Sequence, residues 1–341
     1  MRQAGHIPVL AERVVELLAP ALGARAAPDR PLAGAPAVTP PAPRASHDRA
    51  SPVLLDCTVG LGGHAARVLA AAPDARLVGL DRDPAALAVA AERLRAFGSR
   101  AVLAHASYDE FNRVLAELGI ARVHGVLFDL GVSSLQVDTV RRGFSYARDA
   151  PLDMRMDPGS GTSAAEIVNS YSAEELARVL RDYGEERYAR RIAEAIVRAR
   201  RVAPLTSSRA LAELVRDAVP APARRTGGNP AKRTFQALRI EVNGELDKLR
   251  RALPPAIDAL ADEGRLVAIS YHSLEDRVVK HALRAEARSP LPPDLPVLPD
   301  QLPVPRLRLL TRGGERPGQA EVARNPRATS ARLRAAERVA A

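Results

Sequence analysis

The chain has 341 residues, which is enough for two domains, and its hydrophobic content of 46% is that of a globular protein. No stretch comes near the roughly 20 consecutive apolar residues that cross a bilayer. The first ten residues lack the basic and apolar segments of a signal peptide, so we expect neither export nor a membrane partner. The only cysteine, Cys57, excludes an internal disulfide framework and favours a cytoplasmic protein.

The formal net charge of +10 favours an anionic partner such as nucleic acid. Only three of the 50 basic residues are lysines, however, and the chain is rich in alanine, arginine and proline. A GC-rich genome raises the arginine content of the proteins that it encodes. The charge alone therefore leaves nucleic-acid binding and a compositional bias equally open.

The first third of the chain alternates between strand and helix patterns. A helix is predicted over 9–19, and the proline-rich segment 24–51 is interpreted as a flexible insertion. Strands are then predicted at 53–57, 76–80, 101–105 and 123–128, with helices near 63–72, 84–97 and 108–118. Such alternation is typical of βαβ units, so we predict a parallel sheet with helices on both faces.

The pattern changes after Asp129. Helices with charged faces and no strand are predicted in the stretch that follows, at Ala173–Leu180, Glu185–Arg200 and Ser208–Val219. After a helix over 232–253, the α/β pattern returns with a strand at 265–271 and a helix from Ser273. We therefore predict a helical domain inserted into an α/β domain.

The predicted division of the chain has three parts. Residues 1–138 form the first part of the α/β domain, 139–228 the helical insertion, and 229–341 the second part with the C-terminal tail. Two short runs in the tail, Arg306–Leu310 and Arg332–Val339, are predicted to close the sheet as a hairpin.

A glycine turn follows the first predicted strand. Asp56 ends that strand, the segment Gly60–Gly63 forms the turn, and Asp81 ends the next strand. Glycines let the backbone approach a nucleotide cofactor, and a carboxylate after the second strand can bind both ribose hydroxyls. A turn that only packs a helix on a strand has the same pattern.

The turn fits either a dinucleotide or S-adenosylmethionine. Asp56 favours S-adenosylmethionine, because a carboxylate there would meet the amino-acid end of that cofactor but would repel a pyrophosphate. In addition, no second glycine-turn half follows to hold a nicotinamide nucleotide. We therefore favour a methyltransferase over a dehydrogenase.

The fourth predicted strand ends at Asp129, with Ser133 and Ser134 close behind. In a doubly wound sheet this edge adjoins the cofactor crevice. The lone pair of an exocyclic amine on a base is delocalised into the ring, and an acceptor for the amine hydrogens would localise it for attack on a sulfonium methyl. Each of the three residues could supply this acceptor. A role for Asp129 in orienting the turn or the adenosine is equally open.

A set of motifs covers nearly the whole chain except 24–51 and 286–304. In their order they resemble the bacterial 16S ribosomal RNA (cytosine-N4)-methyltransferases, the MraW or RsmH family. The motifs are His6–Leu10, Asp56 with Gly62–His64, Asp81–Pro84, Asp129–Ser134, Arg142–Ser145, Pro151–Asp157, Tyr183–Arg187, Arg233–Ile240, Tyr271–Arg277 and Asn325–Ala328. This sequence departs from the family at Cys57, where glycine is usual, and at Tyr271, where phenylalanine is usual.

The resemblance implies a class I (Rossmann-like) methyltransferase domain with an inserted all-helical domain and S-adenosylmethionine as cofactor. The implied substrate is N4 of a cytidine in the decoding centre, at the P site, of 16S ribosomal RNA in the small subunit. The catalytic residues would be Asp129, Ser133 and Ser134. The implied cofactor contacts are Gly62, Gly63, His64, Asp81, Tyr108, Asp129 and Gln136.

Four arginines flank a loop near the predicted active edge: Arg141, Arg142, Arg148 and Arg155. We expect them to contact RNA phosphates, which position the RNA without reading its sequence. No His, Cys and Asp set has metal-ligand spacing, so we expect no catalytic metal. The interpretation allows a homodimer. The alternatives are a cofactor-binding ribosome assembly module and a methyltransferase that acts on DNA or protein.

Overall fold

A computed structural model describes residues 8–23, 51–146, 148–224, 229–288 and 304–340. Almost all of the predicted flexible insertion at 24–51 lies outside the described residues. The chain divides into two compact units, Met1–Gly131 with Lys248–Ala341, and Val132–Asp247. We call them the sheet unit and the helical unit. In the described parts of both, no helix has the length and apolar character that would let it cross a membrane.

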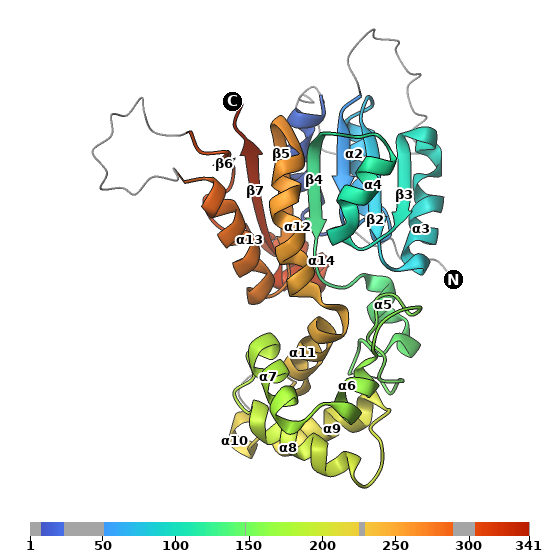
Figure 1. Ribbon diagram of the computed structural model, residues 1–341, viewed down its shortest axis with the longest axis vertical. Helices are drawn as coiled ribbons and strands as arrows, with labels where there is room; N and C mark the ends of the chain where they lie inside the picture. Colours follow the sequence, from blue (N-terminus) through green and yellow to red (C-terminus); the bar gives the residue numbers. More distant parts are fainter. Residues whose placement is uncertain (1–7, 24–50, 147, 225–228, 289–303, 341) are drawn as a thin grey trace, which may run out of the picture. The chain divides into compact units, whose positions relative to one another are not determined.

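The described residues of the sheet unit form a seven-stranded sheet in the order β3-β2-β1-β4-β5-β7-β6 (Figure 1). Neighbouring strands from β3 to β5 run parallel, whereas β7 is antiparallel to both β5 and β6. The predicted parallel sheet is thus confirmed. The strands are β1 (Val53–Asp56), β2 (Arg76–Asp81), β3 (Ala101–His105), β4 (Val123–Asp129), β5 (Leu260–Ser270), β6 (Leu307–Leu309) and β7 (Arg332–Arg338).

Apolar side chains project from both faces of the central strands, because a strand directs successive residues to opposite sides. Leu54 of β1 packs into one buried cluster and Leu55 into the other, and Leu127 and Phe128 of β4 divide in the same way. One face is covered by α1 (Ala11–Leu18), α2 (Gly63–Ala71) and α3 (Pro84–Leu94). The other face is covered by α4 (Phe111–Glu117), α12 (Glu245–Ala259) and α13 (Ser273–Glu286).

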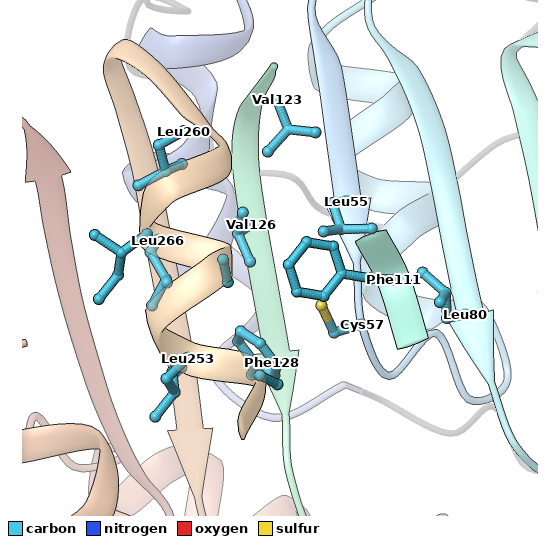
Figure 2. Close-up of a cluster of buried hydrophobic side chains, with 14 of the residues drawn as sticks. Leu55, Cys57, Leu80, Phe111, Val123, Val126, Phe128, Leu253, Leu260 and Leu266 are labelled. Carbon is cyan, nitrogen blue, oxygen red and sulfur yellow. The ribbon is translucent and has the colours of Figure 1, made fainter. Parts of the chain in front are cut away.

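Figure 2 shows part of the cluster under α4 and α12, with Phe111 and Leu253 packed over the strands. Leucine, valine and alanine make up most of it, as the aromatic content of 3% requires. Cys57 lies inside this cluster, and burial raises the pKa of its thiol well above the ordinary value. The thiol therefore acts as a small apolar side chain.

The described part of the helical unit contains one isolated β-bridge, Pro151 to Ser207, and no longer strand. Its helices pack around a single buried cluster that includes Leu176, Ile192 and Leu238. Serine residues cap several of these helices, for example Ser172 at the start of α7. The helices are α5 (Ser134–Asp138), α6 (Ala164–Ser170), α7 (Ala173–Gly184), α8 (Ala189–Arg200), α9 (Ser208–Ala218), α10 (Ala221–Arg224) and α11 (Ala231–Asn243).

The helix predicted over 232–253 is two helices, α11 and α12, and that prediction is wrong at Gly244. This glycine ends α11 in a left-handed conformation, with φ of 60°, and α12 starts at the next residue. Because Phe235 and Leu238 of α11 pack into the helical core, the helical unit spans 132–247 and not 139–228. A glycine inside an otherwise periodic pattern was the signal for this break.

The two tail runs pair antiparallel as β6 and β7, but they do not form a tight hairpin. Helix α14 (Gln319–Arg324) and a 3₁₀ turn at Pro326–Ser330 lie between them along the chain. Strand β5 starts earlier than predicted, at Leu260, where it pairs with Val123 of β4, and the register of this pair shifts between Val123 and Gly125.

Candidate active site

Three carboxylates stand at the carboxyl ends of neighbouring parallel strands. Asp56 ends β1, Asp81 ends β2 and Asp129 ends β4. Because β1 lies between β2 and β4, the three side chains share one edge of the sheet. Asp56 is 1% exposed, whereas the Asp129 side chain is 24% exposed. This edge is where open α/β sheets bind their ligands.

The turn after β1 depends on its glycines. Gly60 and Gly62 have φ values of 52° and 74°, a backbone conformation that residues other than glycine rarely adopt. At Gly63 the space is limiting, because a Cβ there would lie 2.6 Å from Cγ of Pro8. The N-terminal segment therefore packs directly on the turn.

Asp81 fastens this turn to the loop after β2. Its Oδ2 accepts a hydrogen bond from the backbone N–H of Gly60 at 2.8 Å, and its Oδ1 accepts one from Asp83 N–H at 2.9 Å. Each carboxylate oxygen has a further lone pair, so Asp81 can still accept hydrogen bonds from a ligand.

Asp129 is held by two side chains. The Tyr271 hydroxyl donates to its Oδ1 at 2.8 Å, and Nδ1 of His64 lies 3.3 Å from its Oδ2. The other ring nitrogen of His64, Nε2, lies 2.8 Å from the carbonyl oxygen of Val9. A carbonyl and a carboxylate both accept hydrogen bonds, so His64 carries a proton on each nitrogen.

The shift in the pKa of His64 agrees with this geometry. Burial lowers its pKa, but the Asp129 carboxylate and the Val9 carbonyl raise it more, so that the pKa lies above its ordinary value of 6.5. His64 and Asp129 thus form a largely buried ion pair beside the glycine turn.

The peptide group between Val9 and Leu10 is bound on both sides. Its carbonyl faces His64, and its N–H donates to Oε1 of Glu321 at 2.7 Å. Glu321 belongs to α14, near the other end of the chain. The N-terminal segment, α14 and the carboxylate edge are therefore connected through one peptide group.

The buried carboxylates have raised pKa values. Burial raises the pKa of Asp56 to about 7 and that of Asp81 to about 6. Asp129 and Asp81 repel the charge of Asp56 and add to its shift, whereas His64 opposes it. This edge therefore favours a ligand that brings positive charge and hydroxyl donors, which is the chemistry of S-adenosylmethionine with its sulfonium, ammonium and ribose groups.

Tyr108 lies at the same end of the sheet, in a 3₁₀ turn (Tyr108–Glu110) after β3. Its ring meets Phe128 of β4 edge to face, with ring centroids 6.0 Å apart. The ring is only partly buried. The contact with Phe128 holds the ring in place, and part of its surface is exposed. The stacking of this ring on an adenine stays a prediction.

Three other predicted site residues belong to the helical unit. The Ser133 hydroxyl accepts from the N–H of Gln136, and the Gln136 side chain accepts from the N–H of Ser133, so the pair caps α5. Gln136 is buried and Ser134 is half-buried. Their predicted convergence on Asp129 or on a cofactor stays a prediction.

The four predicted RNA-binding arginines differ in their surroundings. Arg155 forms a two-pronged ion pair with Asp153, at 2.8 and 2.9 Å. Arg142 donates to the carbonyl oxygens of residues 155 and 156. Arg141 and Arg148 are exposed. The first two stabilise their own loop, while the last two are open to a partner.

Tyr271 and Thr58 both form hydrogen bonds with Asp129, but neither was predicted as a site residue. Tyr271 follows a predicted strand, and its position at the sheet edge was the available signal. The Thr58 hydroxyl accepts a hydrogen bond from the backbone N–H of Asp129 at 2.6 Å. Nothing in the local sequence pattern indicates that contact, because the partners are 71 residues apart.

Comparison with known proteins identifies the family of the chain. The model of the MraW methylase family matches residues 3–339. A ribosomal RNA small subunit methyltransferase H from Frankia alni is 62% identical over 336 residues, covering 98% of this chain and 95% of the relative. One from Streptomyces avermitilis is 54% identical over 339 residues, covering 99% and 98%.

Among solved structures, an rRNA methylase from Streptococcus thermophilus aligns with a TM-score of 0.38 and 10% identity, covering 85% of this chain and 87% of its own. The family match extends over both units. The chain belongs to the MraW methylase family of S-adenosylmethionine-dependent methyltransferases.

Proposed function

We propose that this chain transfers a methyl group from S-adenosylmethionine to N4 of a cytidine in the decoding centre, at the P site, of 16S ribosomal RNA. The observation that carries the proposal is the edge formed by Asp56, Asp81 and Asp129, with Asp129 held by two donors beside a glycine turn. The names of the relatives support ribosomal RNA of the small subunit as the substrate.

In the proposal, Asp81 binds the ribose hydroxyls and Asp56 faces the ammonium group of the cofactor. The backbone of Gly62 and Gly63 forms the wall of the site, and Tyr108 covers the adenine. His64 and Gln136 complete the set of cofactor contacts that the family resemblance implies. The bound cofactor supplies an electrophilic methyl group on a positively charged sulfur.

Asp129 acts on the substrate amine. Its carboxylate accepts a hydrogen bond from the N4 amino group, which draws the nitrogen lone pair out of the ring and orients it toward the methyl group. Positive charge develops on the nitrogen as the methyl arrives, and the carboxylate stabilises it. Ser133 and Ser134 are proposed to supply further acceptors. The surplus proton leaves to water, so no dedicated base is needed.

The RNA is held by positive charge. Arg141 and Arg148 are exposed and are the proposed phosphate contacts, together with Arg142 and Arg155, whose hydrogen bonds within the loop fix its shape. The proposed substrate, 16S ribosomal RNA, implies a cytoplasmic location. A homodimer also belongs to the proposal, and sedimentation of the purified chain tests it.

Nucleoside mass spectrometry of small-subunit RNA tests the proposal. RNA from a strain that lacks this gene should contain one fewer N4-methylated cytidine, and the parent gene should restore it while an Asp129→Ala version should not. An unchanged methylation map would instead support a cofactor-binding assembly module. Methyl transfer to DNA or protein, but not to RNA, would support the third alternative.

The state of the substrate needs its own comparison. Methyl transfer by the purified chain can be measured on naked 16S RNA and on assembled 30S subunits, with the same cofactor concentration. A higher rate on subunits would place the reaction late in assembly.

A further inference from the structure

The Asp129 carboxylate is held by residues from two distant parts of the sequence. Tyr271 follows β5 and is 142 residues away, and His64 lies in α2. Each contacts a different oxygen of the carboxylate, and 24% of the Asp129 side-chain surface remains exposed. Among the described residues, these two side chains fill one acceptor position on each oxygen, and each oxygen has a further lone pair that can accept from a ligand.

The Tyr271 ring is fixed in place. It packs against the loop after Asp129, where a Cβ added to Gly131 would lie 3.0 Å from Cδ2 of the ring. Its backbone N–H donates to Oε2 of Glu275 at 2.8 Å. Burial and the Asp129 carboxylate raise the pKa of the hydroxyl well above its ordinary value, so the group remains a donor at every working pH.

The His64 ring is fixed as well. One nitrogen faces Asp129 and the other faces the Val9 carbonyl, whose peptide group is bound by Glu321. A rotation of the ring would break both contacts. With both nitrogens protonated, His64 offers Asp129 a charged donor, which is the stronger kind of hydrogen-bond partner.

We infer that Tyr271 and His64 are positioning residues that hold the Asp129 carboxylate in one orientation, so that its free lone pairs meet the target amine in a single geometry. The inference rests on the proposed role of Asp129 in methyl transfer. Small losses of orientation at a reacting group lower the rate even when binding is unchanged.

The test is a double-mutant cycle on Tyr271→Phe, which removes only the hydroxyl, and Asp129→Ala. Single-turnover methylation of 30S subunits at saturating cofactor measures the chemical step, and calorimetry with S-adenosylhomocysteine measures cofactor affinity. We expect Tyr271→Phe to lower the rate about tenfold, as the loss of a hydrogen bond to a charged group does, with cofactor affinity unchanged. When Asp129→Ala is already present, adding Tyr271→Phe should lower the rate of methylation by less than about twofold.

A second variant, His64→Gln, replaces the charged double donor with a neutral amide and should lower the rate in the same Asp129-dependent way. The control is Tyr171→Phe, which removes a tyrosine hydroxyl that donates to the Glu241 carboxylate at 3.0 Å in the helical unit. It should retain the parent rate.

The outcomes separate the inference from the function beneath it. If Tyr271→Phe works at the parent rate, or loses about tenfold even without Asp129, the positioning inference is wrong while the proposed function stands. If the parent chain transfers no methyl group to 30S subunits, the proposed function fails first. If Asp129→Ala works at the parent rate, the proposed role of Asp129 fails, and the positioning inference fails with it. A loss of cofactor affinity that matches the loss of rate would show that Tyr271 supports the cofactor site and not Asp129.

Discussion

The backbone N–H of Asp129 donates a hydrogen bond to the hydroxyl of Thr58, with the nitrogen 2.6 Å from Oγ1. Thr58 belongs to the glycine turn after β1, and Asp129 ends β4. One side chain therefore joins the turn that is proposed to hold the cofactor to the residue that is proposed to act on the substrate.

Replacing Asp81 should prevent cofactor binding. Asp81→Ala removes the proposed acceptor for the ribose hydroxyls and leaves the N–H groups of Gly60 and Asp83 without their partner. We expect the dissociation constant for S-adenosylmethionine to rise at least about 100-fold in calorimetry. Asp74→Ala, an exposed carboxylate in the turn before β2, is the control. Near-parent affinity in Asp81→Ala would remove this residue from the site.

Replacing Asp129 should affect turnover more than binding. Asp129→Ala takes away the group that is proposed to stabilise charge on the amine, and loss of such a group commonly costs about 100-fold or more in kcat. The measurement is methyl transfer to 30S subunits at saturating cofactor. A variant with the parent kcat would show that Asp129 only orients the turn or the adenosine.

The stability of the cofactor-free protein should fall as pH rises from 5 to 8. The pKa of Asp56 is raised from 3.8 to about 7 in the folded state, and that of Asp81 to about 6. Their contribution to stability is therefore complete below about 3.8 and is lost as pH rises through the folded-state values. His64 acts in the same direction, since its pKa lies above 6.5. Urea unfolding at several pH values should show the trend, and Asp56→Asn should weaken it.

The same titration predicts how cofactor binding depends on pH. A positively charged ligand prefers the ionised form of Asp56, so S-adenosylmethionine should bind more tightly at pH 8 than at pH 5.5. Asp56→Asn should bind weakly and with a smaller dependence on pH, because only Asp81 then titrates with a pKa of about 6. Equal pH dependence in the parent and in Asp56→Asn would assign the effect to another group.

The arginines of the helical unit should separate into two classes. Arg141→Ala and Arg148→Ala should weaken RNA affinity and reduce the slope of log K against log salt by about 0.7 to 0.9 for each phosphate that is no longer neutralised. Arg155→Ala should weaken RNA affinity and in addition lower the unfolding temperature, because it also breaks the ion pair with Asp153. Filter binding at several salt concentrations measures the RNA affinity, and thermal unfolding measures the stability, so the two together distinguish the two classes of arginine. Salt-independent RNA affinity would contradict the proposed phosphate binding.

Much of the sheet could be predicted because buried parallel strands appear as short apolar runs. The runs at 53–57 and 76–80 correspond to β1 and β2 within a residue at either end. The break at Gly244 was not predicted, because the apolar period continues across it. Packing of Phe235 against other helices, which the sequence pattern does not contain, decides to which unit α11 belongs.

The carboxylates of the site could also be predicted, since each follows a strand. Their partners could not. Tyr271 is 142 residues from Asp129, and Val9 is 55 residues from His64. Contacts of this kind arise when distant segments pack together, and no local pattern specifies them.

The double attachment of the peptide group between Val9 and Leu10 has a practical consequence for protein engineering. Pro8 packs on Gly63, and the next peptide group is bound by His64 and Glu321. A shortened version that begins after Leu10 would retain every helix and strand of the described fold, yet it would lose the packing on Gly63 and the acceptor that faces His64. Truncation for crystallisation or tagging should therefore leave Pro8–Leu10 intact.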